Sequence, residues 1–187
     1  MVKKITILSV LEPFLEQPNE ELHLAEISRQ LKQPHPTTRQ HLNELEKRGI
    51  LIKTIKGRQT NYKLKLDNPL SIDYLTITEK NKLIEKIEKN LILREIHTLI
   101  KEKYSNNNTI IFGSTAEENK KNNDIDILIT GKINRKDFSE LSEKINKKTH
   151  IINTEKERVT KTLKEEIRKK HIIINKTEET LRWLYWE

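Results

Sequence analysis

The spacing of apolar residues predicts two short helices at the start of the chain. Apolar residues recur every three or four positions over residues 5–15, and this stripe stops before Pro18. The same spacing returns over residues 22–31. Pro34 and Pro36 then interrupt the pattern, because two prolines so close together cannot continue a helix. The second helix is therefore expected to end before them.

A third helix is predicted over residues 37–48. Thr37 and Gln40 stand three positions apart, as the two side chains of a capping box do, and they mark the beginning of this helix. Gly49 follows the last apolar position, where a glycine commonly ends a helix in the left-handed conformation.

Two strand-like runs come next and predict a β-hairpin. Residues 50–56 and 60–66 flank a basic turn around Arg58. Three helices followed by a two-stranded hairpin is the order of elements in a winged helix-turn-helix. Residues 14–31 and 41–51 resemble prokaryotic winged helix-turn-helix regulators, archaeal ones in particular.

This resemblance implies a DNA-binding surface made by the third helix and the hairpin. The helix carries polar side chains suited to base edges in the major groove: Thr38, Arg39, Gln40 and Asn43. The hairpin carries cations suited to phosphates: Lys53, Lys56, Arg58 and Lys63. The alternative is a winged helix that serves as a protein-interaction module.

A longer helical pattern follows the hairpin. Apolar residues keep helical spacing from Thr78 to Lys103, with charged residues between them, and a break at Asn90 is an alternative to one long helix. The stripe could pack on the domain that follows, pair with the same helix of a second subunit, or do both. Because winged-helix proteins often dimerise to read two half-sites, we favour a homodimer.

The remaining residues alternate between strand-like and helical patterns. The expected strands are 109–112, 124–130, 149–153 and 171–174. The expected helices are one from Ser114, then 136–147, 155–169 and 177–186. This order predicts a mixed sheet with flanking helices.

Candidate chemistry gathers where the first of these strands ends in Gly113-Ser114. After nine intervening residues, Asp124 and Asp126 alternate with isoleucines, which places both carboxylates on one face of a strand. The turn offers backbone N–H groups to phosphate, and the carboxylates offer hard oxygen ligands to a metal. The pattern predicts a site for a Mg²⁺-bound triphosphate; the alternative is a solvated acidic strand end.

The same pattern resembles the signature of the minimal nucleotidyltransferases, small relatives of DNA polymerase beta. The resemblance implies that Gly113 lets the backbone approach a phosphate and that Ser114 donates a hydrogen bond to it. It further implies that Asp124 and Asp126 bind metal and are the catalytic residues, with Mg²⁺ and a nucleoside triphosphate as cofactors.

Two departures from the family pattern bear on catalysis. Glu117-Glu118 stand where active members have an Arg-Gly pair. The strand that usually supplies a third carboxylate has His150 near the expected place, and Glu155 lies just beyond its end. Mg²⁺ prefers oxygen to imidazole nitrogen. The sequence therefore predicts a site that binds nucleotide or metal weakly and catalyses poorly.

Composition limits the classes of protein to which the chain can belong and the kinds of site that it can hold. The chain has 187 residues and no cysteine, which excludes disulfides and cysteine-based zinc sites. It contains no signal-peptide pattern and no apolar run of membrane-spanning length, so a cytoplasmic protein without a membrane partner is expected. Residues 1–66 hold 12 Lys and Arg against 7 Asp and Glu, within a net charge of +8. This balance favours a polyanionic partner for the N-terminal third.

The sequence thus predicts a two-domain protein that combines α+β and α/β organisation. The expected parts are a winged helix-turn-helix over 1–68, a linker over 69–90 and a nucleotidyltransferase-like domain over 91–187. The expected function is transcriptional regulation through double-stranded DNA, with the second domain sensing a nucleotide or docking a protein partner. The alternative is an active Mg²⁺-dependent nucleotidyltransferase that modifies an RNA or a protein, as related antitoxins adenylylate a toxin.

Overall fold

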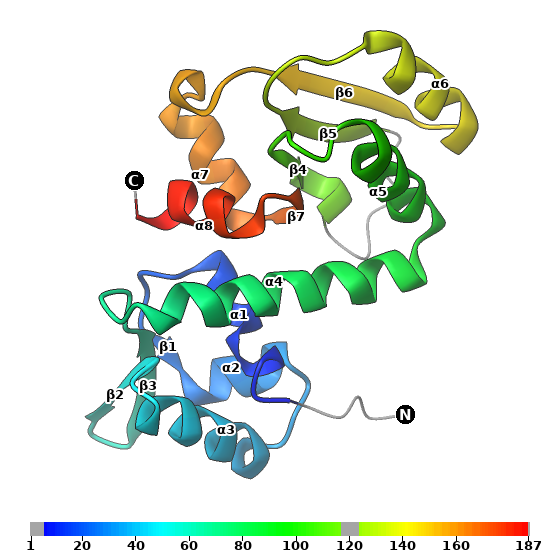
Figure 1. Cartoon of the computed structure of the whole chain (residues 1–187). Coiled ribbons are helices and arrows are strands. Elements are labelled where there is room, and N and C mark those ends of the chain that lie inside the picture. Colours follow the sequence, from blue (N-terminus) through cyan, green and yellow to red (C-terminus); the bar gives the residue numbers. More distant parts are fainter. Residues whose placement is uncertain (1–5, 117–123, 187) are drawn as a thin grey trace. The chain divides into compact units, whose positions relative to one another are not determined.

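Two compact units make up the chain. The computed structural model describes residues 6–116 and 124–186, without the side chains of Ser114 and Thr115. The first unit is Met1–Thr78 and the second is Glu79–Glu187 (Figure 1). Each unit has a sheet of its own. Within the described ranges, no helix combines the length and the apolar character that a membrane span requires.

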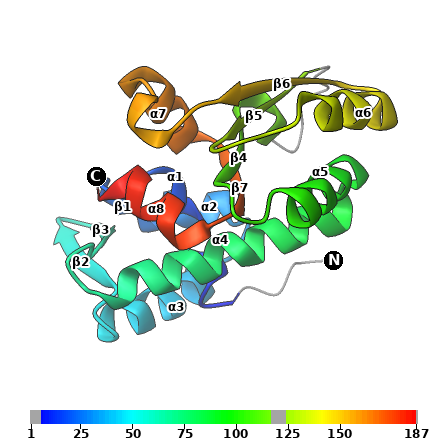
Figure 2. The ribbon, with the colours of Figure 1, turned by 45° about the horizontal axis from the view of Figure 1, so that its top comes forward.

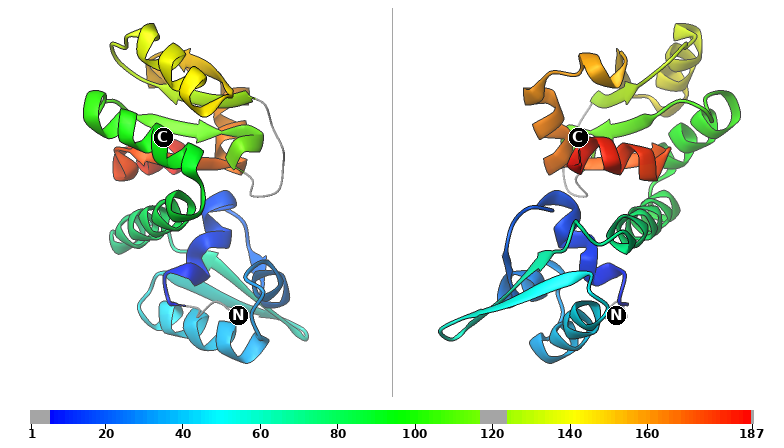
Figure 3. Two further views of the ribbon diagram at one scale, coloured as in Figure 1. Left: turned by 90° about the vertical axis from the view of Figure 1, so that its right-hand side faces the viewer. Right: turned by 60° about the vertical axis from the view of Figure 1, so that its left-hand side comes forward.

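The first unit consists of short helices and a three-stranded sheet. Its helical elements are the 3-10 turn η1 (Ser9–Leu11), α1 (Glu12–Glu16), α2 (Leu24–Gln30) and α3 (His35–Lys47). Its strands are β1 (Leu22–His23), β2 (Leu51–Lys56) and β3 (Gln59–Leu64). They are antiparallel in the order β1-β3-β2. The β2–β3 hairpin extends away from the helices of this unit (Figure 3).

The helix predicted over residues 22–31 begins two residues later. Leu22 and His23 form β1 and pair with Tyr62 and Asn61 of β3. The Nδ1 atom of His23 accepts a hydrogen bond of 3.2 Å from the backbone N–H of Ala25 and so caps α2. The prediction missed β1 because its two residues fit the helical spacing equally well.

Helix α3 begins earlier than predicted. It starts at His35 with Pro34 at the N-cap, and Pro36 lies in its first turn. Proline is tolerated there because the first N–H groups of a helix have no intrahelical partner. No side-chain capping bond forms at this end, so the predicted capping box of Thr37 is wrong. Gly49 has a φ of +71°, which confirms the left-handed ending.

The second unit places a four-stranded sheet among helices. Its helices are α4 (Leu70–Lys89, which begins in the first unit), α5 (Leu91–Lys103), α6 (Arg135–Ile145), α7 (Lys161–Lys169) and α8 (Thr177–Tyr185). Its strands are β4 (Thr109–Phe112), β5 (Asp124–Ile129), β6 (Lys148–Asn153) and β7 (His171–Asn175). Two 3-10 turns, η2 (Gly113–Ala116) and η3 (Lys156–Arg158), complete it.

Two predicted helices are each divided in the structure. The break at Asn90 is confirmed, because its Oδ1 atom accepts from the N–H groups of Ile92 and Leu93 at 3.0 and 3.3 Å and caps α5. The segment predicted as a helix over 155–169 consists of η3 and α7, and the Thr160 side chain caps α7.

The sheet of the second unit is mixed, as predicted. Its strand order is β6-β5-β4-β7, with β5 and β6 parallel and the other two pairs antiparallel. Helices α5 and α6 pack side by side on one face, and α7 and α8 lie together on the other (Figures 1 and 2).

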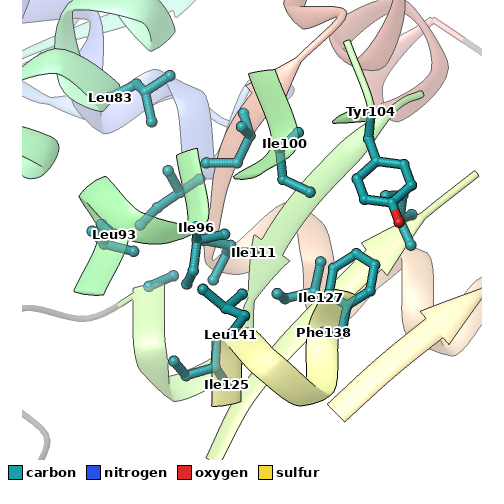
Figure 4. Packing of buried hydrophobic residues seen from close by; sticks show 14 residues of the cluster. Leu83, Leu93, Ile96, Ile100, Tyr104, Ile111, Ile125, Ile127, Phe138 and Leu141 are labelled. Carbon is teal, nitrogen blue, oxygen red and sulfur yellow. The ribbon is translucent and has the colours of Figure 1, made fainter. Parts of the chain in front are cut away.

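The face covered by α5 and α6 carries the main core of this unit (Figure 4). Ile96 of α5 and Phe138 of α6 pack in one cluster with Ile125 and Ile127 of β5, and all four are buried. Burying a side chain of this size contributes about 1.5–3 kcal/mol. Because side chains alternate along a strand, this packing directs Asp124 and Asp126 to the opposite face.

Candidate functional site

Helix α3 has one buried face and one polar face. Leu42 and Leu45 are fully buried, whereas Arg39 and Gln40 are exposed. The helix therefore presents the guanidinium and the carboxamide outward, as the sequence predicts for a base-reading surface.

Thr38 does not belong to this polar face. Its side chain has no exposed surface, and its hydroxyl donates a hydrogen bond of 3.2 Å to the carbonyl oxygen of Pro34 one turn earlier. A side chain on the buried face of the helix cannot reach a base edge. The structure therefore removes Thr38 from the predicted DNA contacts.

Asn43 connects α3 to the hairpin. Its Oδ1 atom accepts hydrogen bonds of 2.9 Å from Lys53 Nζ on β2 and of 2.9 Å from the hydroxyl of Tyr62 on β3. Burial raises the pKa of the Tyr62 hydroxyl, which keeps it protonated as a donor. Asn43 and Lys53 are thus predicted contact residues that also fix the hairpin against the helix.

The cations of the hairpin differ in their surroundings. The ammonium of Lys56 pairs with Glu21, which also accepts a hydrogen bond from Thr54. The hydrogen bonds from Lys56 and Thr54 lower the pKa of Glu21, so this carboxylate stays charged and offsets the charge of Lys56. Arg58 at the turn and Lys63 on β3 are exposed. These two residues are the better placed to meet phosphates.

The Gly113 turn of the second unit lies against Asp126. Gly113 follows Phe112, which is opposite Asp126 in the antiparallel β4–β5 pair. It has a φ of +70°, and a Cβ atom at this position would be 3.1 Å from Asp126 Oδ2. A glycine therefore brings the backbone of the turn close to the carboxylate.

Lys86 of α4 supports the same turn, a contact that sequence reasoning missed. Its Nζ atom donates a hydrogen bond of 2.8 Å to the carbonyl oxygen of Ala116. No motif marks Lys86, which is one of many lysines between apolar positions of a helix. Two other predictions for this turn, the roles of the Ser114 side chain and of Glu117-Glu118, lie outside the described residues.

The carboxylates of the candidate site lie beside an imidazole. Asp126 and His150 are partners in the parallel β5–β6 pair, and His150 Nδ1 is 3.3 Å from Asp126 Oδ1. The His150 side chain is 68% exposed and the Asp126 side chain is 31% exposed. Asp124, two residues earlier on the same face of β5, is exposed. His150 thus lies beside Asp126, near the place where the resemblance implies a third carboxylate.

Glu155 does not reach this group. It follows the carboxyl end of β6, and its Oε1 atom accepts a hydrogen bond of 3.2 Å from the backbone N–H of Gly131, just beyond the carboxyl end of β5. Asp124 and Asp126 lie at the amino end of β5. Because the two strands are parallel, Glu155 is at the other end of the sheet and cannot replace a missing third carboxylate.

The residues that are present fit one divalent cation held jointly with a phosphate. Mg²⁺ in nucleotide sites is commonly bound by one or two carboxylates, while phosphate oxygens and water fill its other positions. Asp124 and Asp126 supply such carboxylates, and both side chains are at least partly exposed. Within the described residues, no three acidic, histidine or cysteine side chains gather closely enough to enclose a metal by themselves.

Comparisons with known proteins divide the chain in the same way. The nucleotidyltransferase domain family matches residues 93–182, and the IclR helix-turn-helix domain family matches residues 7–53. No curated protein and no solved structure shows significant similarity to the chain. The two matches confirm the fusion that the sequence predicts: the chain joins an IclR-type helix-turn-helix domain to a nucleotidyltransferase domain.

Proposed function

We propose that the protein is a transcriptional regulator whose helix-turn-helix domain binds double-stranded DNA and whose nucleotidyltransferase domain binds a metal–nucleotide complex. The observation that carries the proposal is the polarity of α3. Arg39 and Gln40 are exposed while Leu42 and Leu45 of the same helix are fully buried, and the hairpin next to this helix exposes Arg58.

The side chains suit the two kinds of contact that DNA recognition requires. Arg39 can donate two hydrogen bonds to the edge of a guanine, and Gln40 can pair with an adenine. Arg58 and Lys63 carry charges suited to phosphates, which supply salt-dependent affinity without sequence information. Asn43 holds the hairpin to α3 and so fixes the spacing between the two sets of contacts.

The nucleotidyltransferase domain is proposed to bind its nucleotide rather than to catalyse rapid transfer. Gly113 and the two carboxylates of β5 retain the parts that would hold a triphosphate with its metal. The neighbouring strand pairs His150 with Asp126, and the resemblance to the minimal nucleotidyltransferases leads us to expect a third carboxylate near this place in an active enzyme. A ligand-binding domain fused to a DNA-binding domain would let a nucleotide alter the protein's affinity for DNA.

We expect Arg39→Ala and Arg58→Ala both to weaken duplex binding, in different ways. Loss of Arg39 removes a base contact, which costs about 1–3 kcal/mol and relaxes sequence preference. Loss of Arg58 removes a phosphate contact, which weakens binding to every sequence and lowers the slope of log K against log salt by about one. Fluorescence anisotropy with a selected duplex, at several salt concentrations, measures both effects.

Arg182→Ala is the matched control for these variants. Arg182 is an exposed arginine on α8 that pairs with Glu178 on the protein surface, so its loss removes a charge without touching the proposed surface. Binding by this variant should equal that of the wild type. Unchanged binding by both Arg39→Ala and Arg58→Ala would refute the assignment of α3 and the hairpin to DNA.

We expect Mg²⁺-ATP or Mg²⁺-GTP to bind the wild type and not the double variant Asp124→Asn/Asp126→Asn. The amides keep the shape of the carboxylates and remove the negative charge that a cation needs. Isothermal titration calorimetry measures the affinity, and Asp67→Asn, an exposed aspartate in the first unit, is the control.

Absence of binding to the wild type at millimolar nucleotide would contradict the proposed role of the second domain. Incorporation of labelled nucleotide into a protein or an RNA, abolished by Asp126→Asn alone, would instead establish an active nucleotidyltransferase. The two experiments answer different questions: calorimetry measures occupancy of the nucleotide site, and incorporation of labelled nucleotide measures turnover.

A further inference from the structure

We propose that α4 is a dimerisation helix, which pairs with α4 of a second copy of this chain in an antiparallel arrangement centred on Ile77. The proposal concerns assembly, so it goes beyond the proposed function and requires neither DNA nor nucleotide. It assigns a partner to an exposed face of α4 that the proposed function does not use.

The exposed positions of α4 follow a seven-residue repeat. Between the first residue of the helix and residue 84, the exposed residues are Leu70, Asp73, Ile77, Lys80 and Ile84. These positions are separated alternately by three and four residues, which is the spacing of the seam along which two helices pair in a coiled coil. Because seven residues make almost two turns, Leu70, Ile77 and Ile84 lie along one line of the helix.

Three of the five exposed side chains are large and apolar. Leu70 is 53% exposed, Ile77 is 50% exposed and Ile84 is 55% exposed. The same helix also contributes buried apolar side chains, among them Leu75 and Leu83. A surface helix normally carries polar residues on its exposed face, whereas a helix that is apolar all round is normally buried. The exposed face of α4 therefore has the composition of a face that a partner covers.

The charged positions of this face indicate which partner fits. Asp73 stands four residues before Ile77, and Lys80 stands three residues after it. In an antiparallel pair centred on Ile77, Asp73 of each copy lies beside the partner's Lys80, with an offset of one residue, or about 1.5 Å, along the helix axis. Leu70 lies opposite the partner's Ile84 in the same pair. The face is thus complementary to itself, so a second copy of this chain is the partner that fits.

A parallel pair would bring like charges together. With two parallel helices in register, Asp73 would face the partner's Asp73 and Lys80 would face the partner's Lys80, and like charges on facing positions weaken association. The antiparallel pair instead has a two-fold axis through Ile77, so both copies use the same surface and assembly stops at a dimer. A dimer carries two copies of α3, which suits a DNA site with two-fold symmetry.

Sedimentation equilibrium of the untagged full chain over a range of concentrations tests the proposal. We expect the wild type to form a dimer. Ile77→Glu places two like charges at the two-fold axis and should raise the dissociation constant of the dimer at least about tenfold. Because Ile77 is exposed, this variant should fold, and circular dichroism checks that it does. Ile55→Glu makes the same change at an exposed isoleucine of β2 and should leave the dissociation constant unchanged.

Two charge reversals test the direction of pairing. Asp73→Lys and Lys80→Asp each place like charges together at two symmetric contacts, so each should weaken the antiparallel dimer at least about fivefold. The double variant exchanges the two charges and should dimerise as the wild type does. In a parallel dimer, either single variant would only replace one contact between like charges by another, and the dissociation constant would stay near that of the wild type.

A wild type that is monomeric throughout the concentration range would overturn the proposal, as would equal dissociation constants for Ile77→Glu and the wild type. Dimerisation that neither single charge reversal weakens would overturn the antiparallel arrangement. If a monomeric wild type bound phosphatidylglycerol vesicles and Ile77→Glu did not, the exposed face of α4 would belong to a membrane surface and the proposal would fail. DNA binding by a monomeric wild type would leave the proposed function intact while refuting the dimer.

Discussion

Replacement of Glu79 by glutamine is expected to lower the free energy of unfolding of the second unit by about 3 kcal/mol, because it breaks a buried charged cluster. Glu79 of α4 has no exposed surface. Its Oε1 atom is 2.9 Å from His171 Nε2 on β7 and 3.2 Å from Lys82 Nζ. His171 Nδ1 lies 2.8 Å from the carbonyl oxygen of Ile167, so both ring nitrogens face oxygen acceptors. Glutamine would remove the buried negative charge that faces His171 and Lys82.

The pH dependence of stability follows from the same cluster. Burial alone would raise the pKa of Glu79, but the attraction of Lys82 and His171 outweighs it and lowers the pKa from 4.5 to about 2. A group whose pKa is lower in the folded state stabilises the fold above its unfolded pKa. This contribution is therefore present above pH 4.5 and is lost as the pH falls toward 2. Glu79→Gln should flatten the stability curve of the second unit in that range.

Tryptophan fluorescence during urea unfolding of the full chain measures the stability of the second unit, to which Glu79 belongs. The chain has two tryptophans, Trp183 and Trp186, and both belong to the second unit. Glu95→Gln is the matched control, because Glu95 pairs with Lys144 at the surface, where an ion pair contributes about 0–1 kcal/mol. If Glu79→Gln costs no more stability than Glu95→Gln, the buried cluster is not a stabilising interaction.

Sequence reasoning predicted those features that depend on short-range patterns. The alternation of Asp124 and Asp126 with isoleucines correctly predicted a strand with its apolar face in the core, because alternation alone sets the face. The left-handed helix end at Gly49 is predicted correctly, and the break at Asn90, given as an alternative to one long helix, is confirmed, since a left-handed ending and a side-chain cap are both local properties.

The missed features depend on residues far apart in the chain. Leu22 and His23 pair with β3, a partner that their own neighbours do not reveal. Glu79 and Lys86 look like solvent-facing charges between apolar positions of α4. Glu79 is instead buried against His171, and Lys86 donates a hydrogen bond to the carbonyl oxygen of Ala116 in the candidate site. A helical pattern shows which residues share a face, but tertiary packing decides whether a charged residue near the border of that face is buried.

The sequence predicts only part of the candidate site, because the rest depends on residues that are far apart in the chain. The spacing of Gly113, Asp124 and Asp126 marks the site because Gly113 follows one strand that the sequence pattern predicts and the two aspartates begin the next. The pairing of Asp126 with His150 requires the order of strands in the sheet, and only the structure shows that their donor atoms are 3.3 Å apart. Thr38 was assigned to the DNA surface by its position near Arg39, although its side chain lies on the buried face of the helix.

The Gly113→Ala variant is expected to lose at least about tenfold in affinity for Mg²⁺-ATP, which corresponds to about 1.4 kcal/mol. Two physical effects act together. An alanine at a φ of +70° costs about 1–2 kcal/mol of backbone strain. Its Cβ atom would also lie 3.1 Å from Asp126 Oδ2, so the turn or the carboxylate must move. Calorimetry with Mg²⁺-ATP measures the loss.

Gly57→Ala separates the two effects. Gly57 has a similar φ of +61°, but a Cβ atom there would have nothing within 4 Å. Both variants therefore carry backbone strain, and only Gly113→Ala crowds a carboxylate of the candidate site. We expect Gly57→Ala to bind Mg²⁺-ATP as the wild type does while losing some thermal stability. Wild-type nucleotide affinity in Gly113→Ala would show that the close approach of this turn to Asp126 has no part in binding, and the site would then have to be sought away from the Gly113 turn.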